Sequence, residues 1–194
     1  MQLALFNESA PPVRNARYEY LIIISPDNAV KKYAWECNRK VKEILENEGR
    51  QEPMVAHITL VHNISSIEID ELFITAVNNV AAELHSFPVY IKGFDFFERP
   101  NHNVLFISIT NEAEVKAVHD KLYAQLEYES LGFKPHITVK RHIQREKFPL
   151  VWNYFEQLEY ESQFVCDRIL ILKRMVQPHK KENYKPLHEA LLLK

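Results

Sequence analysis

Two hydrophobic periods alternate along this chain, one typical of strands and one typical of helices. Residues 17–25 are rich in β-branched and aromatic side chains, which predicts a strand. Asp27 then offers a helix start, and the apolar positions that follow keep helical spacing as far as Gly49. A second strand is predicted over residues 56–63. The chain therefore opens with a strand, a helix and a strand.

Two capping boxes predict where the next helices begin. Ser65-x-x-Glu68 and Asn111-x-x-Glu114 each place a small polar side chain three residues before a glutamate. Each box precedes an apolar stripe with helical spacing, and the second stripe ends before Gly132. One further helix and the remaining strands complete the pattern. The helix is expected at residues 151–158 and the strands at residues 89–97, 104–110, 135–142, 168–176 and 188–193.

The resulting order, β α β α β β α β α β β, has two similar halves. Mixed strands and helices with several short connections predict an α+β fold with antiparallel sheets and helices on the outside. The composition is even, without a low-complexity linker, so residues 17–194 are expected to form a single domain. Residues 1–16, which include two adjacent prolines, are expected to form an N-terminal arm that leads into it.

Composition and charge exclude several classes of function. The 194 residues carry a net charge of −2, which argues against a long basic surface for duplex nucleic acid but not against a local basic pocket. With only three glycines, the chain cannot build a glycine-rich phosphate loop. Cys37 and Cys166 have neither CxxC nor zinc spacing, which indicates reduced thiols. We find no signal peptide and no apolar run long enough for a membrane span, so we expect a cytoplasmic protein without membrane contact.

Two of the predicted strands share a pattern that carries chemistry. The first contains His57 and Thr59, and the second contains His136 and Thr138, each pair separated by one apolar residue. Residues i and i+2 of a strand share a face, so each strand presents an imidazole and a hydroxyl together. A neutral histidine can take a proton from an attacking oxygen while a protonated one delivers a proton to the leaving oxygen. Threonine hydroxyls can donate hydrogen bonds to phosphate oxygens. Facing each other, two such strands suit a phosphodiester or a cyclic phosphate.

Packing alone explains a single His-x-Thr, because a lone histidine in a strand is usually a surface or core residue. Two copies at matching places in two similar halves are harder to explain that way, since Val, Tyr or Phe would suit a strand better. The other histidines show no zinc-ligand spacing, so no metal site is expected. Phe96 and Phe97 are candidates for stacking a base, although aromatic residues in strands usually belong to the core.

Two cations follow the second motif. Strict alternation places Lys140 on the face of His136, which makes it a candidate phosphate contact. It places Arg141 on the opposite face, from which the side chain reaches a phosphate only if the strand twists or ends there. Otherwise Arg141 is a surface cation.

The paired motifs HITL, from His57, and HITV, from His136, resemble those of the 2H phosphoesterase superfamily. The resemblance is greatest to its 2′-5′ RNA ligase-like and cyclic phosphodiesterase branch. Residues 133–141, FKPHITVKR, resemble the second motif of that branch, in which an arginine follows the threonine by three residues. Residues 91–97 and 104–107 resemble its middle hairpin.

This resemblance implies a bilobal, pseudo-two-fold fold whose two antiparallel-rich sheets line a central cleft. It also implies hydrolysis, without metal or cofactor, of a 2′,3′-cyclic phosphate or a 2′-5′ phosphodiester at an RNA terminus or nucleotide. Carried over by position, the catalytic histidines are His57 and His136, and the phosphate-binding residues are Thr59, Thr138 and Arg141. We expect a monomer. The alternative function is a non-catalytic module that binds RNA ends or nucleotides in the same cleft.

Overall fold

The computed structural model describes residues 17–46, 55–130, 132–177 and 180–194. The N-terminal arm expected over residues 1–16 lies outside these ranges. Four helices are found in the described residues, and all four were predicted. They are α1 (Asn28–Ile44), α2 (Asp70–Ala81), α3 (Glu112–Gln125) and α4 (Phe148–Phe155). The carboxylate of Asp27 accepts a 2.9 Å hydrogen bond from the backbone N–H of Val30, so α1 begins where its capping residue predicted.

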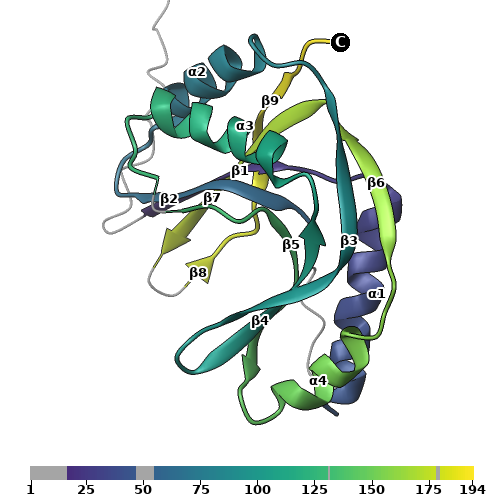
Figure 1. Cartoon of the computed structure of the whole chain (residues 1–194). Helices are drawn as coiled ribbons and strands as arrows, with labels where there is room; N and C mark the ends of the chain where they lie inside the picture. The colour runs from purple at the N-terminus through teal and green to yellow at the C-terminus, as the bar shows by residue number, and fades with distance from the viewer. Residues whose placement is uncertain (1–16, 47–54, 131, 178–179) are drawn as a thin grey trace, which may run out of the picture.

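The strands form two antiparallel sheets (Figure 1). The first has five strands in the order β2-β1-β7-β8, with β9 also paired to β7, and the second has four in the order β5-β4-β3-β6. The strands of the first sheet are β1 (Arg17–Ile24), β2 (Ile58–Ser65), β7 (Arg168–Gln177), β8 (Lys180–Lys181) and β9 (Lys185–Leu191). Those of the second are β3 (Phe87–Glu98), β4 (His102–Ile109), β5 (His136–Gln144) and β6 (Glu161–Cys166). The predicted α+β class is confirmed.

The two halves correspond strand by strand around the motifs. Each motif strand, β2 or β5, is the edge strand of its sheet and pairs antiparallel with the strand that precedes it in the chain, β1 or β4. In each half a single helix, α1 or α3, connects these two strands. This arrangement places the two motifs at equivalent positions of the two sheets.

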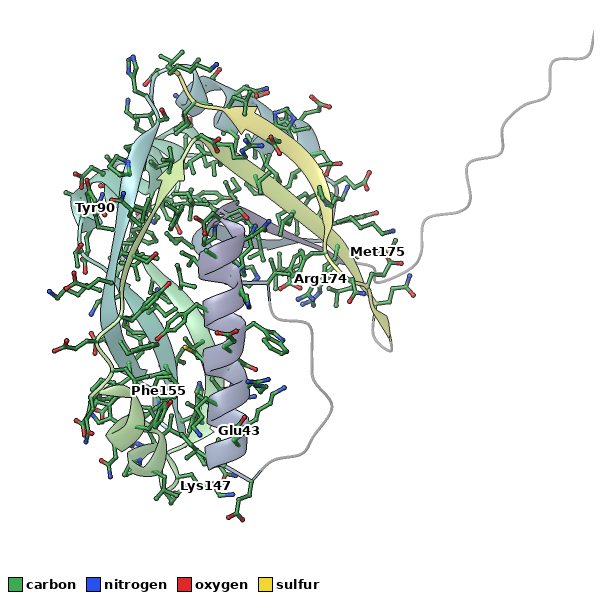
Figure 2. All side chains as sticks on the ribbon, turned by 90° about the vertical axis from the view of Figure 1, so that its right-hand side faces the viewer. Glu43, Tyr90, Lys147, Phe155, Arg174 and Met175 are labelled. Atoms are coloured by element: carbon green, nitrogen blue, oxygen red, sulfur yellow. The ribbon has the colours of Figure 1, made fainter. Side chains whose placement is uncertain are left out.

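Each connecting helix packs on the sheet of the other half. α1 leaves β1 of the five-stranded sheet but packs against β5 and α4, whereas α3 leaves β4 and packs against β2 and α2. Figure 2 shows α1 running along the four-stranded sheet, with Phe155 of α4 beside it. The halves therefore interlock, because each contributes a helix that packs on the sheet of the other.

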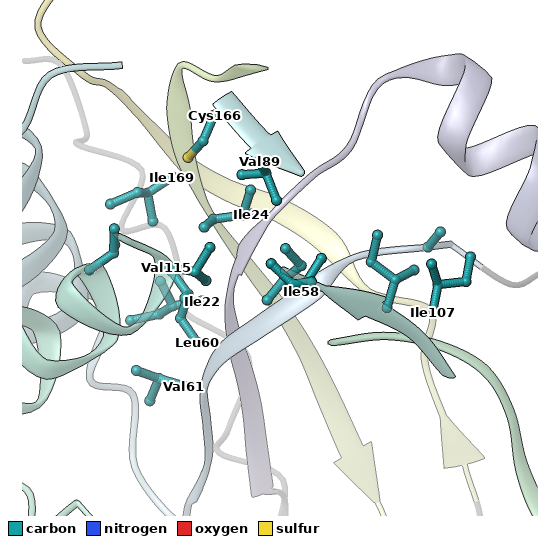
Figure 3. Close-up of a cluster of buried hydrophobic side chains, with 14 of the residues drawn as sticks. Ile22, Ile24, Ile58, Leu60, Val61, Val89, Ile107, Val115, Cys166 and Ile169 are labelled. Atoms are coloured by element: carbon teal, nitrogen blue, oxygen red, sulfur yellow. The ribbon is translucent and has the colours of Figure 1, made fainter. Parts of the chain in front are cut away.

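A single buried cluster joins the two sheets. Ile22 and Ile58, from β1 and β2, and Ile107, from β4, belong to this cluster and are fully buried (Figure 3). Burying apolar surface stabilises a fold by about 25 cal/mol per Å², so a shared core holds the motif strands in fixed relation. The shared core therefore fixes the positions of the histidines at the beginnings of β2 and β5.

Three local predictions were wrong, and the two-residue strand β8 was also not predicted. β6 was missed because its six residues include only two strongly β-favouring side chains, Phe164 and Val165. The Ser65 capping box does not form, since α2 begins at Asp70 and the Ser65 hydroxyl accepts from the backbone N–H of Ile67 instead.

Asn111 does precede α3, but it does not cap the helix with its side chain. Its amide group bonds the backbone of Pro88 and Tyr90 in β3, a tertiary contact that outcompetes the local cap.

Candidate functional site

The two motif histidines stand at the beginnings of the two edge strands. His57 directly precedes β2 and His136 is the first residue of β5. The two strands contact each other where the two sheets meet. Both imidazoles are half-buried, and the charge of His57 influences the pKa of His136. The fold therefore brings together two histidines that are distant in the sequence, as the repeated motif predicted.

The same hydrogen bond fixes both imidazole rings. Nδ1 of His57 lies 2.7 Å from the carbonyl oxygen of Val55, and Nδ1 of His136 lies 2.8 Å from that of Lys134. A carbonyl oxygen can only accept, so each Nδ1 must carry the proton. In the neutral ring this leaves the lone pair on Nε2. The two motifs therefore hold their histidines in the same tautomer, with Nε2 as the basic atom.

Burial and nearby positive charge lower the pKa of both histidines. For each ring, removal from water is the largest cause, because it disfavours the charged imidazolium. The backbone carbonyl that binds Nδ1 acts in the opposite direction, and the Arg141 guanidinium lowers both values further. His57 and Lys134 also lower the pKa of His136. Both rings are therefore mainly neutral near neutral pH.

A β-bulge follows each motif threonine at the same position. In β2, Leu60 is the extra residue, since Thr59 pairs with Ile23 and Val61 pairs with Ile22. In β5, Thr138 pairs with Phe106 and Lys140 with Leu105, so the extra residue is Val139. Bulges are common beside active sites, where they change the direction of a side chain.

Before each bulge, the alternation that the sequence predicted holds. Thr59 and Thr138 are half-buried, while the neighbouring Ile58 and Ile137 are completely buried. Each threonine therefore shares a face with the histidine two residues before it. We call His57, Thr59, His136 and Thr138 the two-histidine site.

The bulges change the predicted orientation of Arg141. Strict alternation would put its side chain on the buried face with Ile137 and Val139, yet Arg141 is exposed. Two register shifts in β5 and the positive φ of His142, 58°, interrupt the alternation between Thr138 and Ile143.

Arg141 acts electrostatically on both His57 and His136, which places its cation beside the two-histidine site. Lys140, the alternative cation, is half-buried and pairs with Leu105.

Aromatic rings surround His136. Phe97 of β3 meets its ring edge-to-face at 4.9 Å, and Phe106 of β4 lies 5.1 Å away. Phe96 points into the other face of the sheet, where it packs on Phe148 and Trp152, as expected for a core aromatic. The half-buried Phe97, with the Arg99 guanidinium 5.4 Å from its ring centre, borders the two-histidine site instead.

His119 of α3 supports the segment that leads into β5, a role that the sequence analysis did not find. The ring is 3% exposed and stacks on Phe133 at 4.1 Å with an interplanar angle of 9°. Phe133 precedes Lys134, whose carbonyl oxygen orients His136. Lys134 is itself held by a 2.7 Å ion pair with Asp95 of β3. The sequence signal for His119 was weak, because a buried histidine in a helix looks like any other polar residue at an apolar position.

Other features of the described residues add no second chemical centre. No group of three or more His, Cys, Asp or Glu that could hold a metal ion occurs among them. A groove of about 360 Å³ lies between α1 and α4, and it contains none of the motif residues. Its Cys37 is buried, and burial raises the pKa of the thiol to about 12, so this cysteine is unreactive. No described helix is long and apolar enough to cross a membrane.

Comparison with known proteins identifies one matching family and several proteins of similar structure. Residues 35–178 match the family model described as the 2'-5' RNA ligase superfamily. TT0787 of Thermus thermophilus has a similar structure, with a TM-score of 0.65 at 16% identity over 90% of this chain and 97% of that one. E. coli LigT in its apo form gives 0.61 at 14% identity over 92% and 99%. LigT complexed with 3'-AMP gives 0.59 at 13% identity over the same shares. A search of curated proteins finds no match.

Proposed function

The chain belongs to the 2'-5' RNA ligase superfamily, and we propose that it is a phosphoesterase that acts by two-histidine acid–base catalysis. Its substrate is a 2′,3′-cyclic phosphate or a 2′-5′ phosphodiester at an RNA end or in a nucleotide. The observation that carries the proposal is the matched pair of rings, each with Nδ1 bound to a backbone carbonyl and Nε2 left free for proton transfer. LigT, a structural neighbour, has been crystallised with nucleotides, which supports a nucleotide substrate.

One histidine serves as the general base. Since burial and nearby charge lower both pKa values from the ordinary value of histidine, Nε2 of this residue carries a lone pair at neutral pH. It takes a proton from the attacking water or hydroxyl. A general base in the right position contributes about 10²–10⁴-fold to the rate.

The other histidine must be protonated to serve as the general acid. In the free protein Arg141 and burial oppose this protonation. A bound phosphodiester brings a negative charge next to the rings, which favours the imidazolium and offsets the effect of Arg141. Substrate binding therefore prepares the acid. Which ring is acid and which is base depends on the direction of the reaction, because the same pair serves ring opening and ligation.

The threonines and Arg141 bind the phosphate. The hydroxyls of Thr59 and Thr138 share strand faces with the two histidines and donate to the nonbridging oxygens, whose negative charge grows in the transition state. Arg141 supplies a positive charge from the strand that carries His136. Side chains therefore hold the phosphate, because a chain with only three glycines cannot form a glycine-rich phosphate loop.

The test is turnover of a substrate panel in excess EDTA. The panel comprises 2′,3′-cyclic mononucleotides, RNA ending in a cyclic phosphate, 2′-5′ oligoadenylate and ADP-ribose cyclic phosphate. We expect at least one member to react in EDTA and to lose reactivity in both His57→Ala and His136→Ala. Equal activity of wild type and both variants would overturn the mechanism. Binding of RNA ends without turnover of any member would instead establish the alternative function, a non-catalytic module.

Two further properties belong to the proposal. Both cysteines are free and buried, which is consistent with a reducing compartment, so the cytoplasm is the proposed location. The catalytic groups all come from one chain, so the proposed active unit is the monomer.

A further inference from the structure

A buried carboxylate lies on the five-stranded sheet outside the two-histidine site. Glu19, in the middle of β1, is 7% exposed. Its Oε2 accepts a 2.6 Å hydrogen bond from Nε of Arg174 on the neighbouring strand β7. Its Oε1 lies 2.9 Å from Nε2 of His62 on β2. Glu19 thus connects side chains from three adjacent strands. Figure 2 labels Arg174 on its strand.

The hydrogen bonds to Glu19 keep it ionised. Burial alone would raise its pKa, but the bonds from Arg174, Tyr184 and His62 lower it to about 2. An ionised carboxylate can only accept, so Nε2 of His62 must carry a proton. In the neutral form of the ring, Nδ1 then has a lone pair and can accept a hydrogen bond. Glu19 therefore selects the tautomer of His62, just as backbone carbonyls select the tautomers of His57 and His136.

His62 occupies the same place in the first motif that Arg141 occupies in the second. Each follows its motif threonine by three residues, and each comes after the bulge that begins one residue past that threonine. In β2 the bulge buries both Leu60 and Val61, so His62 returns to the face of Thr59 with its side chain 48% exposed. The sequence patterns are H-x-T-x-x-H and H-x-T-x-x-R.

Tyr184 links this cluster to the opposite strand. Its hydroxyl donates to Glu19, and the Arg174 guanidinium stacks on its ring at 3.9 Å. Arg141 of β5 acts electrostatically on Tyr184, as it does on both motif histidines. Through Tyr184, the cluster of Glu19, His62, Arg174 and Tyr184 therefore lies beside Arg141.

Stability alone does not account for a buried Glu–Arg pair. Removing two charges from water costs about as much free energy as their attraction returns, and well-packed apolar residues are often equally stabilising. What this pair does achieve is a fixed orientation for His62, a half-exposed side chain that would otherwise rotate.

We propose that His62 contacts the nucleoside of the substrate and that Glu19 is a positioning residue, which holds the His62 ring so that Nδ1 accepts from a hydrogen-bond donor. The inference rests on the proposed function, whose substrates are nucleotides. The donor is a sugar hydroxyl or a base amino group. Arg141 then binds the phosphate from one motif strand, while His62 binds the adjoining nucleoside from the other.

The experiment measures kcat and KM with three substrates: 2′,3′-cyclic AMP, its 5′-deoxy analogue and its purine analogue, which lacks the amino group. His62→Ala lowers kcat/KM for cyclic AMP about tenfold, mainly through KM, as expected for one lost hydrogen bond. With the analogue that lacks the donor, kcat/KM of wild type falls by a similar factor, whereas kcat/KM of His62→Ala shows no further decrease. This analogue identifies the donor as the hydroxyl or the amino group. Equal losses for wild type and variant with both analogues would overturn the contact.

The positioning role of Glu19 is tested by a double-mutant cycle. Glu19→Gln also lowers kcat/KM, but the double variant with His62→Ala is no worse than His62→Ala alone, because Glu19 acts through His62. Additive losses would overturn this role. ¹⁵N spectra of the His62 ring provide a second measurement: Nε2 is protonated in wild type, and Glu19→Gln changes the tautomer ratio. His62→Gln, which retains an acceptor, recovers part of the lost activity. His85→Ala, at an exposed histidine between α2 and β3, is the matched control and leaves all values unchanged.

Failure of the proposed function gives a different result. If wild type turns over none of the substrates, binding of 2′-AMP and 3′-AMP is measured by titration calorimetry. About tenfold weaker binding by His62→Ala, with His85→Ala unchanged, supports the contact without catalysis. Unchanged binding by His62→Ala overturns it.

Discussion

The side-chain amide of Asn38 donates a 2.6 Å hydrogen bond to the backbone carbonyl of Val139. Asn38 lies in α1, which begins after β1 of the five-stranded sheet, and Val139 is the bulged residue of β5 in the other sheet. A bulge interrupts the ladder of hydrogen bonds between strands, so its backbone groups need other partners. The connecting helix of one half thereby holds the bulge between Thr138 and Arg141 in the other half.

Asn38→Ala is expected to destabilise the protein and to lower its activity. The variant leaves the Val139 carbonyl without its partner, which costs about 1–3 kcal/mol in the free energy of unfolding. Urea unfolding measures this loss, and kcat/KM for the reactive substrate reports the displacement of Arg141.

Asn79→Ala is the matched control. This amide donates to Gln125 at an exposed position, so its removal should change stability by less than about 0.5 kcal/mol. If the two variants had equal stability and full activity, Asn38 would have no role in maintaining the bulge.

Removal of either motif histidine is expected to lower kcat by about 10²–10⁴-fold. His57→Ala and His136→Ala should each have a large effect, while the double variant should be far less impaired than the product of the two, because acid and base act as a unit. Single-turnover kinetics on a 2′,3′-cyclic nucleotide measure the chemical step. His85→Ala again provides the control. A double variant whose loss equals the product of the single losses would show that the rings act independently.

Arg141→Gln is expected to shift the pH dependence of kcat/KM to higher pH. The guanidinium lowers the pKa of both His57 and His136, since positive charge disfavours the imidazolium, and its removal lets both values rise. Wild type should therefore have its optimum below the ordinary histidine pKa of about 6.5, and the variant should move both limbs upward. Kinetics between roughly pH 4 and 9, together with NMR titration of the rings, test the shift.

Arg145→Gln, at the end of the β5 region and paired with Glu98, is the control for Arg141 and should leave both pKa values nearly unchanged. Lower pKa values in Arg141→Gln would contradict the assigned direction.

Glu19 is expected to make stability depend on acid pH. Its pKa is about 2 in the folded protein against an ordinary value of 4.5, so the unfolded chain binds the proton more readily. The stabilisation is fully present above pH 4.5 and is lost as the pH falls towards 2, with a total of about 3 kcal/mol. At neutral pH, Glu19→Gln should be less stable than wild type by a similar amount, because Arg174 stays largely buried without its partner.

Urea unfolding at a series of pH values tests this expectation, with Glu161→Gln on the exposed pair Lys92–Glu161 as control. The gap between wild type and Glu19→Gln should close towards pH 2, whereas the control should follow wild type throughout. A gap that stays constant over this range would show that Glu19 does not titrate as the structure indicates.

Local patterns in the sequence were sufficient for the four helices and seven of the nine strands in the described residues, the repeated His-x-Thr and the shared face of each histidine and threonine. These features depend on periodicity within a few residues, which a strand or helix preserves wherever it is placed. The cap at Asp27 was predictable for the same reason. Strand β6 was not, because its stability comes from pairing with β3 rather than from its own side chains.

The orientation of Arg141 and the hydrogen bonds of Glu19 depended on tertiary structure alone. Bulges after Thr59 and Thr138 arise from the pairing of each strand with its neighbour, and they change which residues share a face. Arg174 and Tyr184 lie far from Glu19 and His62 in the chain, and only the fold brings them together. The sequence by itself therefore determined which residues are candidates for the chemistry, whereas the packing of the two sheets decided how those residues face one another, since register and side-chain direction are set by contacts between distant segments.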